Sequence, residues 1–490
     1  MLFTSLEFLV FLPLVVGAYY WAPPRWTGSL LLISSIVFYA VASMGHPEHA
    51  LLLLWLAMTA QLAVFRMTSS NPGEARRWFI FGIFAVLAPL VVFKYWNFSA
   101  GAGNALATSI RLGTPQLPLH QLAVPVGISF ITLQTLSYVI DVYLGRARPA
   151  RTLAQAASFV SFFPLALAGP IERAGNLMPQ LTRPASLECG RLVVGGRLLL
   201  WGFFKKLVIA DNLAALVGVV YDGTGAPNGL AVLVATYAFA IQIYCDFSGY
   251  TDIARGAAQL LGIDVMQNFD APYEARSIAE FWRRWHLSLS TWLRDYVFTP
   301  LSLGGNRTPV RGYAAVLFTF MVSGLWHGAG WTFVAWGFLH GVYIASSLVS
   351  RRWRDRLWGS GARGRTRTWV ARFTTFHLVC ISWIVFRSAS LGRAVELLTR
   401  LVVELPGNII ALLSGQAALS AFGAFARWEL VALVGGGVAV LLAERAVREP
   451  RVARALMAAP GGRLALYALI LYAIVFLGNF GETAFIYSQF

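Results

Sequence analysis

Two histidines in strongly apolar surroundings are the residues of this sequence best suited to chemistry. His286 lies in a segment rich in tryptophan and arginine, and His327 lies between Trp326 and the small residues 328–330. An imidazole titrates near neutral pH, so it can take a proton from a hydroxyl group and return it within one reaction cycle. A polar group deep in an apolar segment is costly and usually functional. We therefore expect a functional role for His327; for His286 alone, hydrogen-bonded packing is the alternative.

The segment around His286 is expected to form one helix that begins at Ile278. Ser277 would cap this helix, and Glu280 in its first turn would suit the positive end of the helix dipole. Helical spacing would then place on one side Trp282, His286, Leu289 and Leu293. The tryptophans and arginines around this side are typical of a helix anchored at a membrane interface. They are Arg283, Arg284, Trp285, Trp292 and Arg294.

Further polar and aromatic side chains are predicted to line a vestibule beside the two histidines. Some are expected where an apolar helix ends, and others in the loop that precedes Ser277. For each polar residue taken singly, hydrogen bonding to loop backbone is the alternative. The expected lining residues are Asp246, Ser248, Tyr250, Asn268, Trp282, Trp285, Trp326 and Asn306.

Composition places these residues in a membrane protein. Of the 490 residues, 57% are hydrophobic and 12% are charged, whereas soluble domains carry about 25% charged residues. The mean hydropathy is +0.63, and many apolar runs approach the ~20 residues that cross a bilayer. The net charge of +17 comes mainly from arginines in short loops between these runs, which indicates membrane topology and anionic lipid rather than nucleic acid. The three cysteines are widely spaced and indicate neither a disulfide framework nor a metal site; we expect no bound metal or resident cofactor.

Thirteen apolar runs predict an all-α, multi-pass membrane protein that forms a single domain over residues 1–490. They fall at 5–22, 28–44, 50–66, 78–98, 122–144, 155–169, 192–220, 228–248, 313–325, 331–350, 370–387, 428–444 and 463–479. The first is expected to be a retained helix rather than a signal peptide, because it lacks a basic start and carries Glu7. The basic loops are cytoplasmic by the positive-inside rule. Both chain ends and the excursion at 388–427 are then extracytoplasmic; the excursion would be an interfacial hairpin or a partner-docking surface.

Two of the runs are too short for simple spans. Segments 155–169 and 313–325 carry or adjoin glycine and proline, as at Pro164 and Gly324. Irregular backbone at membrane depth is tolerated only where protein buries it or it lines a wet cavity. These segments therefore predict broken or re-entrant helices around an internal tunnel. Lys205 and Lys206, within 192–220, are expected to extend their ammonium groups to the interface.

The sequence resembles the membrane-bound O-acyltransferase family, in particular the bacterial branch with alginate O-acetyltransferase membrane proteins and the D-alanyl transfer protein of teichoic acid synthesis. The likeness is carried by Phe281-Trp282-Arg283-Arg284-Trp285-His286 and by Gly324-Leu325-Trp326-His327-Gly328-Ala329. It extends over a core at 122–345 and beyond it. Further matching stretches lie at 3–8, 125–130, 137–143, 163–171, 202–207, 246–252, 268–269, 287–296, 304–307 and 485–487.

The resemblance implies a ring of membrane helices in the bacterial inner membrane, with His327 as the family's catalytic histidine and His286 at its second active-site position. It implies transfer of an acyl group, here acetyl, from a cytoplasmic thioester (acetyl-CoA or an acyl carrier protein) toward an extracytoplasmic polysaccharide such as alginate or cellulose. A periplasmic acetyltransferase or a polysaccharide-synthesis protein is an implied partner. Alternative roles for four basic residues are contacts with the donor's phosphates; these are Lys205, Lys206, Arg283 and Arg284.

Three other functions remain open at this point. The catalytic motif is compatible with transfer of D-alanine or with acylation of a lipid. A transporter without bond-making chemistry would show paired repeats with broken helices at corresponding positions, which are not evident by eye. Within acyl transfer, we expect His327 to be the base and His286 to orient or stabilise the acyl carbonyl; an acyl-histidine relay is the variant.

Overall fold

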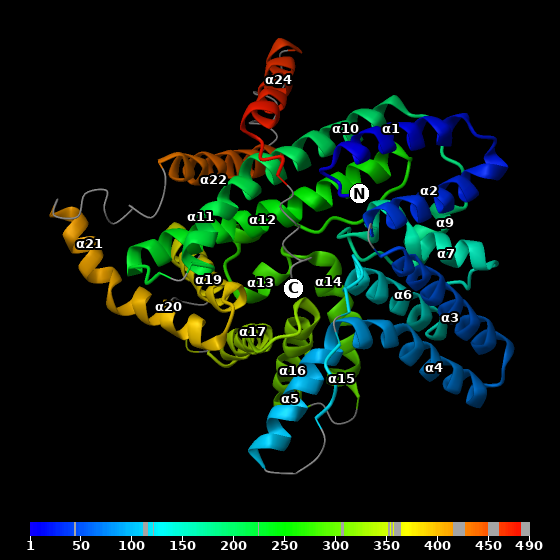
Figure 1. The fold of residues 1–490 in the computed structure, drawn as a ribbon, viewed down its shortest axis with the longest axis horizontal. Coiled ribbons are helices and arrows are strands. Elements are labelled where there is room, and N and C mark those ends of the chain that lie inside the picture. Colours follow the sequence, from blue (N-terminus) through cyan, green and yellow to red (C-terminus); the bar gives the residue numbers. More distant parts are fainter. Residues whose placement is uncertain are drawn as a thin grey trace. The chain divides into compact units, whose positions relative to one another are not determined.

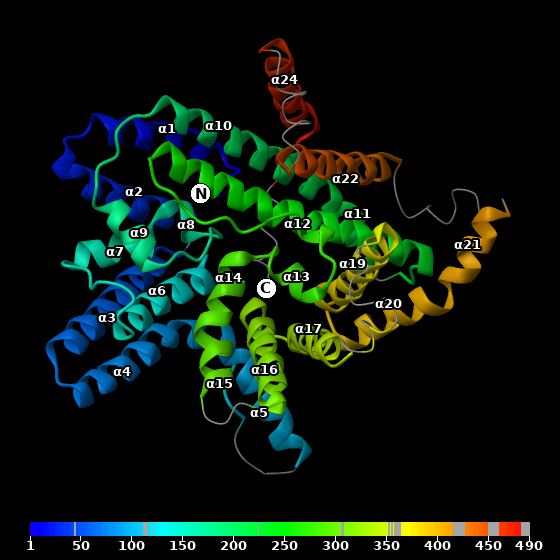
Figure 2. The same ribbon diagram turned by 180° about the vertical axis from the view of Figure 1, so that it is seen from behind.

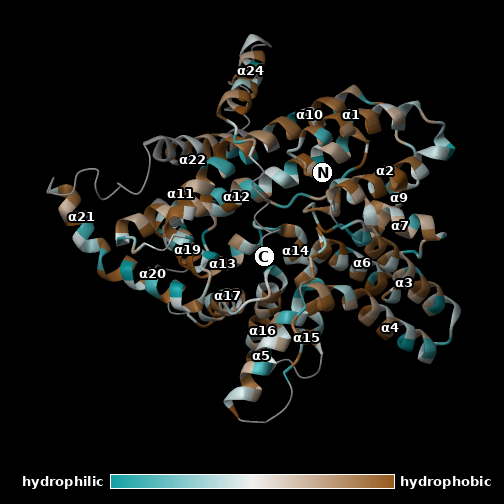
Figure 3. Cartoon of the chain, viewed as in Figure 1, coloured by the Kyte–Doolittle hydropathy of each residue, from teal (hydrophilic) through white to brown (hydrophobic). Residues whose placement is uncertain are grey.

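The computed structural model consists of helices and their connections. It describes residues 1–490 except 44, 45, 111–115, 121, 224, 305–307, 351, 352, 354, 355, 357–363, 415–426, 449–459 and 482–490. No strand occurs in this part of the chain. Six of its helices are long and apolar enough to cross a membrane, and four shorter apolar helices accompany them. The prediction of an all-α, multi-pass membrane protein is confirmed, and the brown helices of Figure 3 show how much apolar surface they carry.

The described residues form two compact units. The first comprises residues 1–199 and 250–267. In it α3 and α4 lie side by side, α6 contacts both, and α7 contacts α2 and α3 (Figures 1 and 2). The main helices of this unit are α1 (Leu6–Trp21), α2 (Thr27–Ala42), α3 (Ala50–Ser69), α4 (Pro72–Leu90), α5 (Trp96–Ser109), α6 (Ile128–Tyr143) and α7 (Leu153–Ser161).

The break predicted within 155–169 is present. Helix α7 ends at Ser161, the single turn α8 (Phe163–Ala166) begins beside Pro164, and the next helix, α9 (Ala174–Leu181), follows an irregular stretch. The Ser35 hydroxyl accepts the backbone N–H of Phe163 at 3.1 Å, so a side chain from α2 satisfies backbone that the break leaves exposed. Irregular backbone here is therefore buried in protein, as the membrane requires.

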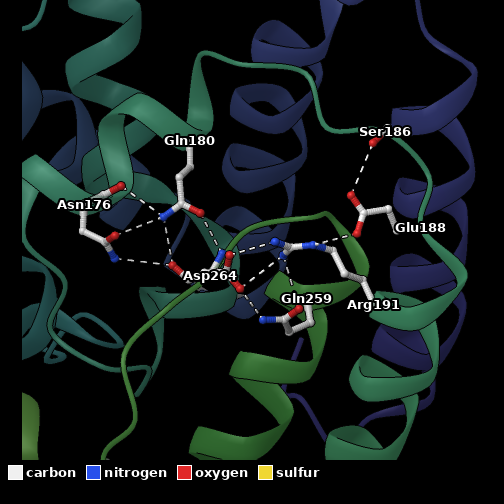
Figure 4. A network of polar contacts seen from close by, with 7 residues as sticks. All are labelled: Asn176, Gln180, Ser186, Glu188, Arg191, Gln259 and Asp264. Atoms are coloured by element: carbon white, nitrogen blue, oxygen red, sulfur yellow. Dashed lines mark hydrogen bonds and ion pairs between the residues drawn. The ribbon is translucent and has the colours of Figure 1, made fainter.

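A polar network in the first unit centres on Asp264, in the loop after α12 (Figure 4). Arg191 holds Asp264 with two parallel hydrogen bonds, of 3.2 and 2.9 Å, and Gln259 donates to the same carboxylate at 2.6 Å. The Asp264 backbone N–H donates to Gln180 Oε1 at 2.8 Å. The hydrogen bonds from Arg191 and then from Gln259 lower the pKa of Asp264 below its ordinary value of 3.8, despite an opposing contribution from burial. The network ties α9 and α10 (Cys189–Phe203) to the loop that follows residue 260.

One short segment of this unit groups possible metal ligands, two of them exposed and one buried. His46, Glu48 and His49 each place a ligand atom within 4.8 Å of the others, the only such group among the residues that the structure describes. The Glu48 carboxylate lies 2.9 Å from His46 Nδ1, so an ordinary exposed hydrogen bond accounts for the pair. That the chain binds no metal stays a prediction.

The second unit comprises residues 200–249 and 268–490. In this unit α16 lies against α17, which also contacts α19, and α20 continues from α19 into α21 (Figures 1 and 2). Its main helices are α11 (Asp211–Tyr221), α13 (Ile278–Trp282), α14 (Leu287–Leu293), α15 (Thr299–Leu303), α16 (Pro309–His327), α17 (Trp331–Val349), α19 (Arg365–Arg387), α20 (Leu391–Val403), α21 (Leu405–Leu413), α22 (Arg427–Arg448) and α24 (Pro460–Leu477). Helices α10 and α12 (Gly229–Leu260) each contribute residues to both units.

Two helix boundaries differ from the prediction. Segment 313–325 is not broken: α16 is continuous from Pro309 to His327, and Gly324 serves helix packing instead. Helix α12 does not end near Asp246 but runs on to Leu260. Asp246 and Ser248 are accommodated inside this apolar helix because basic side chains from a neighbouring segment meet them.

Candidate active site around His286 and His327

His327 is the last residue of α16, and its position follows from how that helix is built. The Thr308 hydroxyl accepts the N–H of Arg311 at 3.3 Å, and Pro309 occupies the first turn, where no donor is lost. Every fourth residue then forms a buried stripe that ends at the histidine. Its members are Ala315, Thr319, Ser323 and His327.

Two glycines bring α17 close enough to enclose His327. A methyl group added at Gly324 of α16 would strike the Phe333 carbonyl oxygen, and one added at Gly337 of α17 would strike that of Phe320. Small residues at helix contacts let backbones approach closely in membranes. The approach sets the ring of Trp336 perpendicular to the ring of His327, with centroids 5.0 Å apart.

A third histidine fixes the aromatic wall behind Trp336. The Trp282 indole N–H donates to His340 Nδ1 at 3.2 Å, so His340 carries its hydrogen on Nε2 and donates it to the Ser382 hydroxyl at 2.9 Å. Ser382 in turn donates to the Val379 carbonyl at 2.7 Å. His340 therefore joins α13, α17 and α19 by a directed chain of hydrogen bonds.

His286 lies at a break between two short helices. Ser277 caps α13 as predicted, accepting the N–H of Glu280 at 3.1 Å, but α13 ends at Trp282. His286 then takes left-handed backbone angles, with φ 45° and ψ 55°, and α14 starts at Leu287. The prediction of one continuous helix with Trp282, His286, Leu289 and Leu293 on one side is wrong. Such a conformation costs about 1–2 kcal/mol for a residue with a side chain and clusters at functional sites.

Asn268 holds this break in place. Its backbone carbonyl accepts the N–H of Leu287 at 3.0 Å, and its side-chain oxygen accepts the N–H of Ser288 at 3.1 Å. The fully buried Asn268 therefore caps α14 from a distant part of the chain. Phe247 of α12 meets the His286 ring edge to face, at a centroid distance of 4.6 Å.

The structure brings the two predicted histidines together. Their ring centroids are 6.4 Å apart, and Trp326 contacts both rings, at 5.6 Å from His286 and 4.9 Å from His327. His286 is 0% exposed and His327 is 2% exposed, so water has little access to either imidazole. Two buried imidazoles at this separation can address two different groups of one reacting centre, one as a base and one as a hydrogen-bond donor.

The tryptophans around His286 are not interfacial anchors. Trp282, Trp285 and Trp292 are all buried, and Trp285 stacks on Phe281 with centroids 5.4 Å apart. Of the neighbouring arginines, Arg283 is exposed and Arg284 pairs with Glu280 at 2.8 Å. The prediction that these tryptophans anchor a helix at the membrane interface is therefore wrong. Their side chains are packed inside the protein.

A second polar cluster joins α12 to two buried lysines. Lys206 is buried and bridges Asp211, at 2.7 Å, and Asp246, at 2.6 Å. Lys205, also buried, donates to the Ser248 hydroxyl at 2.8 Å. The expectation that these lysines extend to the membrane interface is wrong, because acidic and hydroxyl partners from α11 and α12 hold them inside. Phe247, which lies between Asp246 and Ser248 in the chain, contacts the His286 ring.

The cluster is built on a π-helical segment, η4 (Phe204–Ala210), between α10 and α11. The wider turn releases the Leu207 carbonyl, which accepts the backbone N–H of Asn479 at 3.0 Å and the Asn212 side chain at 3.3 Å. π-Helical turns are rare in proteins, and those that occur are often found at functional sites. Here the turn points both lysines inward and ties down the chain after α24.

The vestibule role of two predicted residues stays a prediction. Tyr250 is buried in the first unit, where its ring lies 5.7 Å from that of Phe3. Asn306 lies outside the described residues. Conversely, Ser323 and Trp336 were not singled out on sequence, although Ser323 precedes His327 by one helical turn and that spacing pointed to it.

Known proteins match this chain over most of its length. A family model described as MBOAT, membrane-bound O-acyltransferase family, matches residues 151–390. The chain is 39% identical over 401 residues to a probable alginate O-acetylase of Azotobacter vinelandii, covering 80% of this chain and 76% of that protein. It is 29% identical over 436 residues to a peptidoglycan O-acetyltransferase of Helicobacter pylori, covering 81% and 79%. It is 27% identical over 368 residues to a teichoic acid D-alanyltransferase of Bacillus subtilis, covering 73% and 89%.

Proposed function

Because this chain belongs to the membrane-bound O-acyltransferase family, we propose that it transfers acetyl from a cytoplasmic thioester to hydroxyl groups of an extracytoplasmic polysaccharide. The relatives named as O-acetylases and O-acetyltransferases support acetyl as the acyl group and a polysaccharide as its destination. The observation that carries the mechanism is the pair of buried imidazoles, His286 and His327, with centroids 6.4 Å apart.

His327 is the base in this proposal. It takes the proton of the acceptor hydroxyl as the oxygen attacks the thioester carbonyl, and it gives the proton to the departing thiolate. Positioned base assistance of this kind contributes typically ~10²–10⁴-fold in rate. A thioester needs little further activation, so the remaining demand is stabilisation of the negative charge on the carbonyl oxygen.

His286 orients or stabilises the acyl carbonyl. Its left-handed backbone and the cap from Asn268 hold the imidazole in one place, which is what a preorganised group requires. The donor approaches from the cytoplasmic side and the acceptor from outside, through a tunnel between the helices. Arg283 is exposed and available to the phosphates of the donor.

The test compares His327→Ala, His286→Ala and His377→Ala at matched membrane levels, with the acetyl content of the exported polysaccharide as readout. His377 of α19 is the matched control, because it hydrogen-bonds Tyr237 of α12 and the Phe373 carbonyl of its own helix and has no ring contact with the site histidines among the described residues. We expect near-complete loss for His327→Ala, partial loss for His286→Ala and wild-type acetylation for His377→Ala. Wild-type acetylation by His327→Ala would contradict the proposal.

The relative named as a D-alanyltransferase supplies the second candidate. Purified protein supplied with [1-14C]acetyl-CoA, or with a D-alanyl thioester of a carrier protein, separates the two. If only the D-alanyl donor passed its acyl group to an acceptor, the chain would be a D-alanyltransferase rather than an acetyltransferase. The proposed role of His327 would be unchanged.

A further inference from the structure

Two hydrogen-bond donors beside His327 have no partner within the part of the chain that the structure describes. They are the hydroxyl of Ser323 and the indole N–H of Trp336, and both residues are 0% exposed. A buried donor without a partner costs about 1–3 kcal/mol, and such groups in native proteins call for an explanation. Two of them next to one candidate catalytic group indicate a ligand that supplies the missing acceptor.

Ser323 is aimed by the helix that carries His327. It precedes the histidine by four residues, so both side chains lie on the same face of α16. Thr319, one turn earlier on this face, shows the usual fate of a helical hydroxyl, since it donates to the Ala315 carbonyl at 2.6 Å. The Ser323 hydroxyl makes no such bond to its own helix among the described residues.

Trp336 of α17 contacts the ring of His327. Its ring stands at 90° to the His327 ring, with centroids 5.0 Å apart, and Gly337 next to it fixes the close helix crossing. The neighbouring Trp282 has its N–H occupied by His340, whereas the Trp336 N–H is left without an acceptor in the described structure. Trp336 is therefore held rigidly by packing while its one polar atom stays available.

We propose that the Ser323 hydroxyl and the Trp336 indole N–H donate hydrogen bonds to the carbonyl oxygen of the acyl thioester and stabilise the oxyanion that forms on it. This inference rests on the proposed acyl transfer. The acceptor oxygen bonds to the carbonyl carbon and its proton passes to His327, which leaves a negative charge on the carbonyl oxygen. The C–S bond then breaks, the thiolate takes the proton from His327, and the products are an ester and a free thiol.

The first test measures kcat and KM for transfer from [1-14C]acetyl-CoA to alginate oligosaccharides, with purified protein in lipid nanodiscs. The variants are Ser323→Ala and Trp336→Phe. Their matched controls are Thr319→Val and Trp383→Phe. Trp383 is also 0% exposed with its N–H unpartnered among the described residues, and it stacks on Trp336 at 5.9 Å, but no ring contact with His327 is found there.

Removal of one oxyanion donor typically lowers kcat by about 10²–10³-fold. We expect a loss near the lower end for Ser323→Ala and for Trp336→Phe, with KM little changed, and near wild-type kcat for both controls. Equal losses in Trp336→Phe and Trp383→Phe would show that the indole N–H groups matter only for packing, and would overturn the assignment.

A second readout does not depend on turnover. Without acceptor, the infrared carbonyl band of bound [1-13C]acetyl-CoA should lie at lower frequency in the wild type than in Ser323→Ala or Trp336→Phe, because hydrogen bonds weaken the C=O bond. An identical band in all three proteins would overturn the inference even if a variant had lost activity through misfolding. Wild-type protein that transferred no acetyl would instead overturn the proposed function, and this inference with it.

Discussion

The imidazoles of His286 and His327 lie 6.4 Å apart, centroid to centroid, although the two residues arrive by different means. His327 ends a regular 19-residue helix, whereas His286 occupies a left-handed break between helices of five and seven residues. The position of the His327 ring therefore depends on helix packing, and the position of the His286 ring depends on the cap that Asn268 provides. Substitutions near each should fail in different ways.

Replacing His286 separates its side chain from its backbone conformation. His286→Asn and His286→Gly both tolerate left-handed angles, so we expect wild-type amounts of folded protein. Asparagine keeps a hydrogen-bond donor, whereas glycine removes it and should lower acetyl transfer by about 10²-fold. His286→Val, a β-branched residue in the same conformation, should reduce the folded protein itself. The measurement is the transfer rate per folded molecule; equal rates for the glycine variant and the wild type would exclude a role for the imidazole.

The glycines between α16 and α17 should control the position of His327. Gly324→Ala places a methyl group against the Phe333 carbonyl, so the helices must separate, at a cost of about 1–3 kcal/mol for overpacking. Gly312→Ala on the same helix is the control, because nothing lies within 4 Å of the added carbon. Heating followed by size-exclusion chromatography in detergent should show a lower midpoint for Gly324→Ala only. Equal thermal midpoints for Gly324→Ala and Gly312→Ala would mean that α16 and α17 accommodate the added methyl group without a loss of stability.

Lys206 should be essential to the fold of the second unit rather than to the reaction. Lys206→Met leaves Asp211 and Asp246 buried without that cation, and breaking a buried pair costs about 3–5 kcal/mol. The triple variant Lys206→Met, Asp211→Asn, Asp246→Asn removes the charges together and should recover much of this loss. Thermal midpoints of the two variants measure the difference. If both were equally destabilised, the charge imbalance would not be the cause.

The Arg191–Asp264 pair makes a small, pH-dependent contribution to the first unit. Because the folded-state pKa of Asp264 lies below its ordinary value of 3.8, the stabilisation is present above about pH 4 and is lost as the pH falls through the folded-state pKa. The carboxylate is more than half exposed, so Asp264→Asn should cost no more than about 1 kcal/mol at pH 7. The difference in thermal midpoint between wild type and variant should shrink toward pH 3. If the difference in thermal midpoint grew as the pH fell, the folded-state pKa of Asp264 would not lie below its ordinary value.

The helical class, the Ser277 cap and the pairing of the two histidines were all within reach of sequence reasoning. The break at His286 was not, because residues 283–285 include neither glycine nor proline; Asn268 and the surrounding rings impose it. The burial of Lys205 and Lys206 could not be predicted either, because their acidic and hydroxyl partners belong to other helices. The sequence pattern does not show which of these groups pair. Local propensity and patterning show where helices form, but not which polar groups neutralise one another.

The glycine crossing of α16 and α17 also bears on the order in which the site is assembled. The two helices are consecutive and joined by residues 328–330, so their contact closes a very short loop and needs no later part of the chain. The perpendicular seat of His327 on Trp336 is thus available as soon as both helices exist, whereas Trp383 and Phe386 reach this wall only with α19. A nascent chain that stops after α17 would therefore hold the His327 ring against Trp336 before Trp383 and Phe386 pack on that tryptophan.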